Sequence, residues 1–234
     1  MKKIENKQPE QSGFMSARRK ILTQNSTFAA QEAYRSLRTN VRFALQGKGC
    51  KKICITSGTA GEGKSITLLN FAISVGEAGQ KVLLIDADLR RPALARLMVE
   101  KAAPGLSNVL ADLVPAEEAI RKNVYQNVDI MFSGDIPPNP SELLGGDTMR
   151  SLVETMKDRY DYILIDTPPV NVVSDACIVA NLLDGVLLLA RQNSSKKDDL
   201  RRAVSRLQMT GAKILGFVLN DANLIKEKAY YYYE

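Results

Sequence analysis

A glycine-rich turn at residues 58–65 constrains this chain more than any other segment, because it fits the pattern G-x-x-x-x-G-K-[ST]. In that pattern backbone N–H groups wrap the phosphates of a nucleoside triphosphate, the lysine reaches the terminal phosphates, and the hydroxyl ligates Mg²⁺. An apolar, β-branched run at Lys51–Ser57 precedes the turn, and apolar residues at helical spacing follow it. Strand, loop and helix N-terminus in this order form an anion site. The expected nucleotide contacts are Gly58, Thr59, Ala60, Gly61, Glu62, Gly63, Lys64, Ser65 and Ile66.

Apolar runs alternate with helical segments along the rest of the chain. Lys81–Asp86 and Tyr162–Asp166 are continuous apolar runs that end in aspartate. Further strands are expected at 128–132, 185–190 and 213–219, and helices at 141–159, 174–183 and 195–210. These runs predict an α/β fold of the P-loop NTPase type, with a mostly parallel central sheet flanked by helices on both faces. Ligands bind such sheets beyond the carboxyl ends of the strands, which is where Gly58, Asp86 and Asp166 fall.

Candidate side chains for phosphoryl transfer gather at that edge. Ser65 and Asp166 are the expected Mg²⁺ ligands, with Asp86 as a further candidate. Asp86 and Asp88 are two residues apart, so in an extended chain their side chains lie on one side. One would hold metal-bound water while the other accepts a proton from the attacking group. The alternative interpretation is a capping or turn pair, because aspartate is common at strand ends.

Composition excludes several other chemistries. The chain has no histidine, which rules out imidazole catalysis and histidine-ligated metals, and its three cysteines suggest neither a disulfide framework nor a metal cluster. No apolar run approaches the ~20 residues that cross a bilayer, so a cytoplasmic location is expected. Residues 1–50 hold ten Lys/Arg against three Glu, and the rest sums to about −1. This predicts a flexible basic arm at 1–27, without a role in nucleic-acid binding. The arm either faces an anionic surface or an acidic partner, or residues 1–25 are only a solvated tail, and the sequence favours neither.

Two segments outside the nucleotide site stand out. An amphipathic helix is expected at 29–46, and Glu32, Arg35 and Arg38 by themselves read as its solvated face. Four of the eight tyrosines occupy Tyr230, Tyr231, Tyr232 and Tyr233. Adjacent rings near a chain end do not share a packing face, so an exposed phosphate acceptor is favoured over a nonspecific sticky end or occasional β-pairing. The expected domains are therefore the arm, a body at 28–222 and a flexible tail at 223–234.

Several segments together resemble the deviant-Walker P-loop superfamily, and within it the bacterial tyrosine kinases that regulate capsule and exopolysaccharide synthesis. The matching segments are 56–65, 86–92, 137–144 and 165–169, the E-x-x-R-x-x-R pattern of Glu32, Arg35 and Arg38, and the cluster Tyr230–Tyr233. The resemblance covers residues 28–234. It implies ATP and Mg²⁺ as ligands, Asp86 as catalytic base assisted by Asp88 and Lys64, Asp166 as organiser of Mg²⁺, and Asn220 near the purine base.

The same resemblance implies an assembly. Glu32, Arg35 and Arg38 would join subunits into a ring, an octamer, in which the tail of one subunit enters the active site of its neighbour. A separate transmembrane activator would recruit the kinase to the inner face of the membrane. Protein-tyrosine phosphatases and other proteins would be further substrates, and phosphorylation of the tail would loosen the ring.

Two rival functions remain open at this point. A positioning or partitioning ATPase of the same superfamily would use the nucleotide as a switch, without a phosphorylated product. Such relatives usually carry a lysine after the first loop glycine, where this chain has Thr59. A regulatory scaffold would use the nucleotide only to control assembly and the tail as a binding motif. The tyrosine block favours the kinase.

Overall fold

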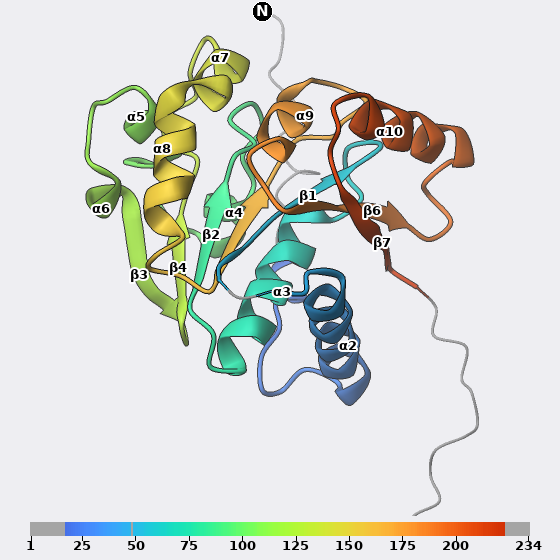
Figure 1. Ribbon diagram of the computed structural model, residues 1–234. Coiled ribbons are helices and arrows are strands. Elements are labelled where there is room, and N and C mark those ends of the chain that lie inside the picture. The colour runs from blue at the N-terminus through green and yellow to red at the C-terminus, as the bar shows by residue number, and fades with distance from the viewer. Residues whose placement is uncertain (1–16, 48, 223–234) are drawn as a thin grey trace, which may run out of the picture.

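A seven-stranded sheet forms the centre of the molecule, in the order β3-β4-β2-β5-β1-β6-β7 (Figure 1). The computed structural model describes residues 17–47 and 49–222. All neighbouring strands are parallel except β3 and β4, which pair antiparallel at one edge. The strands are β1 (Lys51–Ser57), β2 (Val82–Asp86), β3 (Ile120–Tyr125), β4 (Val128–Met131), β5 (Tyr162–Asp166), β6 (Gly185–Arg191) and β7 (Ile214–Asn220).

Helices connect these strands and cover both faces of the sheet (Figure 1). They are α2 (Phe28–Ala44), α3 (Lys64–Glu77), α4 (Leu94–Met98), α5 (Leu106–Leu110), α6 (Ala116–Ala119), α7 (Pro140–Gly145), α8 (Asp147–Met156), α9 (Asp175–Ala180) and α10 (Lys197–Met209). α2 begins after Thr27, whose side chain accepts a hydrogen bond from the N–H of Ala30, a common N-cap arrangement. None of the helices in the described part of the chain is long and apolar enough to cross a membrane.

The apolar core is divided by the sheet into two layers. One layer packs α3 and part of α2 against β1, β2 and β5, and contains Phe71, Leu68 and Ile55. The other packs α8, α9 and α10 against the opposite face, and contains Met149, Val179 and Leu207. β2 and β5 are buried along their whole length, as expected for parallel strands covered on both sides. The predicted α/β fold with helices on both faces of a mostly parallel sheet is confirmed.

Several elements differ from the sequence-based expectation, among them the short helices α4, α5 and α6, which were not expected. The single helix expected at 141–159 is two helices, α7 and α8, separated at Gly146, whose backbone is extended. Strand β3 was not expected, because its polar residues Arg121, Lys122 and Asn123 interrupt any apolar run. An edge strand needs only one buried face, so β3 carries little of the signal that identifies a central strand.

The segment before α2 lies against the body of the molecule, although the sequence predicted a flexible arm up to residue 27. Leu22 is buried in the α3 layer of the core. Its backbone N–H donates to Asn70 Oδ1 (2.7 Å), and Asn70 Nδ2 donates to the carbonyl of Lys20 (2.9 Å). This contact places residues 17–27 beside α3.

Candidate active site

The turn at residues 58–65 links β1 to α3 and places Lys64 at the first position of that helix. Gly61 and Gly63 have φ angles of 81° and 95°, a left-handed conformation that glycine adopts without strain. A Cβ atom on Gly63 would lie 2.3 Å from Nδ2 of Asn220, so this position has no room for a side chain. Lys64 is 8% exposed at the helix N-terminus, where free N–H groups and the helix dipole favour an anion.

Hydrogen bonds from the ends of β6 and β7, and from the loop after β6, fix the conformation of the turn. Glu62 is buried, and its Oε1 accepts hydrogen bonds from Thr59 Oγ1 (3.1 Å) and from the Ser195 hydroxyl. Its Oε2 accepts no hydrogen bond from residues 17–47 or 49–222. Asn220, at the end of β7, donates from Nδ2 to the carbonyl of Glu62 (2.8 Å). Arg191, at the end of β6, donates to the carbonyl of Gly61 (3.4 Å). The loop conformation therefore depends on contacts from β6 and β7.

Two buried aspartates end the neighbouring strands β2 and β5. Asp86 and Asp166 are partners in the parallel register, and their side chains are 0% and 1% exposed. Burial raises the pKa of Asp166 to about 6, against the lowering effects of the Lys64 charge and the Ser65 hydroxyl. Burial and the charge of Asp166 raise the pKa of Asp86 well above its ordinary value. Asp166 thus lies close enough to Lys64, Ser65 and Asp86 to interact with each of them.

Asp86 and Asp88 occupy different environments, although the sequence placed them on one side of an extended chain. β2 ends at Asp86, whose two oxygens accept hydrogen bonds from the N–H groups of Asp88 and Leu94 (both 3.2 Å). Asp88 is half-buried, and its Oδ1 accepts from the N–H of Arg91 (2.9 Å). Of the two aspartates, only Asp88 lines the cavity beside the turn.

The residues of this edge fit a divalent cation. Both carboxylate oxygens of Asp166 are buried and accept no hydrogen bond of ordinary geometry, which is costly unless a ligand completes the site. The Ser65 hydroxyl lies nearby and lines the cavity. No group of three or more His, Cys, Asp or Glu that could hold a metal occurs within residues 17–47 and 49–222. A nucleotide-bound Mg²⁺ needs only one or two protein carboxylates, because phosphates and water complete its shell.

A cavity of about 1360 Å³ opens beside the turn. Ala60, Gly61, Gly63, Lys64, Ser65 and Ile66 form one wall, and Asn220 and Asp221 another. The remaining walls come from residues 17–27, α2, the segment from Asp88 to Leu97, and the single residues Asn70, Tyr125 and Arg191. Most of the predicted nucleotide contacts therefore face one cavity, together with the predicted purine contact Asn220.

Arg90 follows β2 but does not line this cavity. Its guanidinium donates to both oxygens of Asp175 (2.8 and 3.1 Å) and to Ser141 Oγ (2.8 Å). Ser141 also donates to Asp175 (2.7 Å), whose side chain is 0% exposed. This network ties the loop after β2 to α7 and α9.

The predicted oligomerisation residues are on α2. Glu32 and Arg35 form an ion pair (3.5 Å) with both side chains about half exposed. Arg38 instead donates to the carbonyl and hydroxyl of Ser74 on α3, within the same chain. The predicted phosphorylation sites Tyr230–Tyr233 lie outside the described residues.

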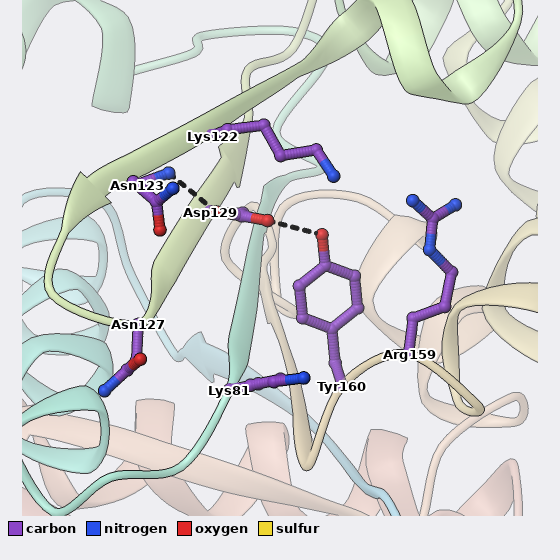
Figure 2. Close-up of a pocket in the computed structure, with 7 residues that line it drawn as sticks. All are labelled: Lys81, Lys122, Asn123, Asn127, Asp129, Arg159 and Tyr160. Carbon is purple, nitrogen blue, oxygen red and sulfur yellow. Dashed lines mark hydrogen bonds between the residues drawn. The ribbon is translucent and has the colours of Figure 1, made fainter.

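A second cavity, of about 280 Å³, lies at the amino ends of the parallel strands, opposite the nucleotide turn (Figure 2). Lys81, Asn127 and Tyr160 in its wall stand just before β2, β4 and β5. Its carboxylate, Asp129, accepts from the Tyr160 hydroxyl and from the N–H of Asn123 (both 2.7 Å), as the dashed lines in Figure 2 mark. Because Asp129 is already paired, this cavity has none of the unsatisfied groups found at Asp166.

Sequence reasoning missed several residues that shape the site. Ser195 and Arg191 hold the turn, but Arg191 is the last residue of β6 and Ser195 lies in the polar loop after it, and neither is part of a motif. Asp175 follows Ser174 at a helix start, where an acidic residue is ordinary and signals no network. The role of residues 17–27 in the cavity wall was hidden by their polar, unpatterned sequence.

Comparison with known proteins agrees with this geometry. A family profile described as an AAA domain matches residues 50–188. Tyrosine-protein kinase YwqD of Bacillus subtilis is 38% identical over 86% of this chain and 85% of its own length. Tyrosine-protein kinase CpsD of Streptococcus agalactiae is 36% identical over 82% of this chain and 83% of its own. The solved kinase domain of Escherichia coli tyrosine kinase ETK superposes with a TM-score of 0.80, at 36% identity, covering 88% of this chain and 80% of that one.

The fold is also shared with a positioning ATPase. The septum site-determining protein MinD from Pyrococcus horikoshii, solved in complex with Mg-ADP, superposes with a TM-score of 0.61 at 29% identity. The match covers 73% of this chain and 70% of that chain. The similarity to the ETK kinase domain is greater than the similarity to MinD in TM-score, sequence identity and coverage.

Proposed function

The chain belongs to the family of bacterial tyrosine-protein kinases, and from this premise we propose that it transfers the γ-phosphoryl group of Mg-ATP to its own tyrosine cluster, Tyr230–Tyr233. The observation that carries the proposal is the juxtaposition of the buried Asp166 with Lys64 and Ser65. Lys64 and Ser65 line one end of a cavity whose volume, about 1360 Å³, exceeds the ~300–1,000 Å³ of small-molecule sites. Such a cavity has room for a nucleotide and for an acceptor side chain.

The phosphate end of the cavity is preorganised. Lys64 and the N–H groups of the turn would cradle the β- and γ-phosphates, and Asn220 would contact the base. Ser65 and Asp166 are the residues that would hold Mg²⁺, which neutralises charge on the phosphates when bound. Asp86 is less suited to this role, because both of its oxygens already accept backbone hydrogen bonds.

A carboxylate beside the acceptor would take the phenolic proton. The resemblance assigns this role to Asp86, but its side chain is fully buried and does not line the cavity. We therefore propose that Asp88 accepts the proton and that Asp86 holds Asp88 in place through the Asp88 N–H (3.2 Å). A phenol has a pKa of about 10, so a base at this position would contribute about 10²–10⁴-fold to the rate.

Transfer between subunits is the arrangement we propose for the tail. β7 ends at Asn220 and Asp221 lines the cavity, so the described part of the chain ends at the rim of its own site. We propose that the tail enters the site of a neighbour in a ring, an octamer, joined through Glu32 and Arg35. Arg38 would support this surface from within by its bonds to Ser74.

The wider role that we propose rests on the family resemblance. A separate transmembrane activator would recruit the kinase to the inner face of the membrane, where it would regulate capsular or exopolysaccharide synthesis. Protein-tyrosine phosphatases and other proteins would be further substrates.

A mixing experiment tests both the reaction and its direction. One chain carries Lys64→Met with its tyrosines intact, and the other has Tyr230–Tyr233 replaced by phenylalanine with its active site intact. With Mg-ATP, and with the activator's cytoplasmic segment added in parallel, neither chain alone should give a phosphotyrosine signal, whereas the mixture should. Signal in wild type but not in the mixture would contradict transfer between subunits. ATP hydrolysis without any phosphotyrosine would support the ATPase alternative.

A further inference from the structure

The cavity beside the turn continues past the nucleotide contacts into a region with a different character. Its walls there include Leu97 of α4, Tyr125 at the end of β3, and Tyr34 of α2. Leu97 is buried, and the two tyrosines are partly buried against the same core layer. Apolar and aromatic walls of this kind suit a flat ring.

Unpaired arginines border this region. Arg91 lines the cavity next to Asp88 and is exposed, and its guanidinium forms no hydrogen bond or ion pair with any residue in the described ranges. Arg18 lines the same cavity, and its charge lowers the pKa of Tyr125, against the larger raising effect of burial. By contrast, Lys20 and Arg191 are already paired with Asp221 (3.0 and 2.6 Å). Two guanidinium groups are therefore available to an anion.

We propose that this region is an acceptor subsite that binds a tyrosine next to an anionic group, with Arg91 and Arg18 receiving that anion. The inference rests on the proposed function, since it concerns the acceptor of the same reaction. A guanidinium presents a planar fork of N–H donors that matches a phosphate or a carboxylate, so phosphotyrosine and glutamate share the chemistry recognised here. The ring of the acceptor would lie against Leu97 and Tyr125.

The subsite implies an order of phosphorylation. Tyr233 is followed by Glu234, whereas Tyr230 is preceded by Lys228 and Ala229. Tyr233 would therefore be modified first. In that step its phenolic oxygen forms a bond to the γ-phosphorus as the bond to the bridging oxygen of ATP breaks, which leaves ADP, and the phenolic proton passes to Asp88. The new phosphotyrosine then supplies the anion for Tyr232, and the series runs toward Tyr230.

Peptide binding tests the subsite without requiring catalysis. The protein is the full chain with Tyr230–Tyr233 replaced by phenylalanine, loaded with Mg-ADP, and the probes are fluorescent peptides of residues 226–234. One peptide is unmodified, one carries Glu234→Gln, and one carries phosphotyrosine at position 233. Fluorescence anisotropy should show about tenfold tighter binding of the phosphorylated peptide and weaker binding of the Gln peptide.

The variants of the protein separate this inference from its rivals. Arg91→Ala should remove the tenfold preference, and Arg91→Lys should keep part of it, because charge remains without the fork. Arg150→Ala, an exposed arginine on α8 outside the cavity, should leave the preference unchanged. Equal binding of the three peptides, or a preference that survives Arg91→Ala, would overturn the subsite.

The order of modification provides a second readout. A time course of the wild-type tail with Mg-ATP, analysed by mass spectrometry, should show phosphate at Tyr233 before Tyr230. A peptide preference without any phosphotyrosine in the tail would refute the proposed function but keep the subsite. Phosphorylation that starts at Tyr230 would refute the order and the subsite while keeping the kinase.

Discussion

Asp86 and Asp166 lie side by side at the carboxyl ends of β2 and β5, both buried, and the charge of Asp166 makes Asp86 harder to ionise. Lys64 is the cation that acts most strongly on Asp166. When both carboxylates are ionised, the one lysine leaves a net negative charge in a dry site, and a bound cation would offset it. This edge of the sheet is therefore less stable by itself than with its ligands.

Removing the charge of Asp166 should stabilise the free protein. In EDTA at pH 7.5, we expect Asp166→Asn to increase the free energy of unfolding by about 2 kcal/mol, measured by urea denaturation, because a buried ionised group is lost. Kinase activity and the stabilisation by Mg-ATP should disappear together. A loss of stability at pH 7.5 would contradict the argument.

The increase in the free energy of unfolding caused by Asp166→Asn should depend on pH, and it should be larger at higher pH. The pKa of Asp166 is about 6 in the folded chain and lies above its unfolded value near 4. Between these values the folded state binds more protons, so its stability falls as pH rises through the window. The difference between Asp166→Asn and wild type should therefore shrink toward pH 4.5. A difference that is equal at pH 4.5 and 7.5 would point to packing instead of charge.

Asp175 offers the opposite case, because it is equally buried but already paired. Its two oxygens accept three hydrogen bonds, two from Arg90 and one from Ser141. We expect Asp175→Asn to lower the free energy of unfolding by about 1–3 kcal/mol, since it removes the charge partner of Arg90. Urea denaturation at pH 7.5 checks this, and an effect of the same sign as that of Asp166→Asn would contradict it.

Ser195 should affect nucleotide binding although it does not line the cavity. Ser195→Ala leaves Glu62 with Thr59 as its remaining side-chain partner, so the turn loses a hydrogen bond to a charged group. We expect the Kd for ATP, measured by calorimetry, to rise about three- to tenfold. Ser194→Ala, a change at the exposed neighbouring position, is the control and should bind ATP like the wild type.

Chemical rescue should identify the carboxylate that accepts the proton. Asp88→Ala and Asp86→Ala are both expected to lose transfer about 10²–10⁴-fold with ATP binding largely kept. Added formate should restore part of the activity to Asp88→Ala, because that position faces the cavity, and none to the fully buried Asp86→Ala. Rescue of Asp86→Ala alone would return the base role to Asp86, and loss of ATP binding by Asp86→Ala would remove that residue from the transfer step.

The central part of the fold was predictable because its signals are local. β5 begins at Tyr162 and ends at Asp166 as expected, since a continuous apolar run between polar ends describes a central parallel strand. The turn at 58–65 was predictable because its glycines, lysine and serine are needed at fixed spacing. Parallel strands then bring Asp86 and Asp166 to the same edge without further assumptions.

The remainder depends on contacts between distant residues. Arg90 and Asp175 are 85 positions apart, and nothing in either segment indicates that they meet. The difference between Asp86 and Asp88 arises because β2 ends at the first of them, so the extended spacing no longer applies. A sequence pattern indicates periodicity and composition. The Arg90–Asp175 contact and the different environments of Asp86 and Asp88 depend instead on where strands end and on which distant segments a loop contacts.

The Lys20–Asp221 ion pair has a practical consequence. It joins the segment before α2 to the residues that follow β7, directly beside Gly61 and Arg191. We expect an affinity tag or fluorescent fusion placed before Lys20 or after Asp221 to weaken this ion pair. Assays of recombinant protein should therefore compare tags at both positions with a cleaved preparation before any rate is assigned to the kinase itself.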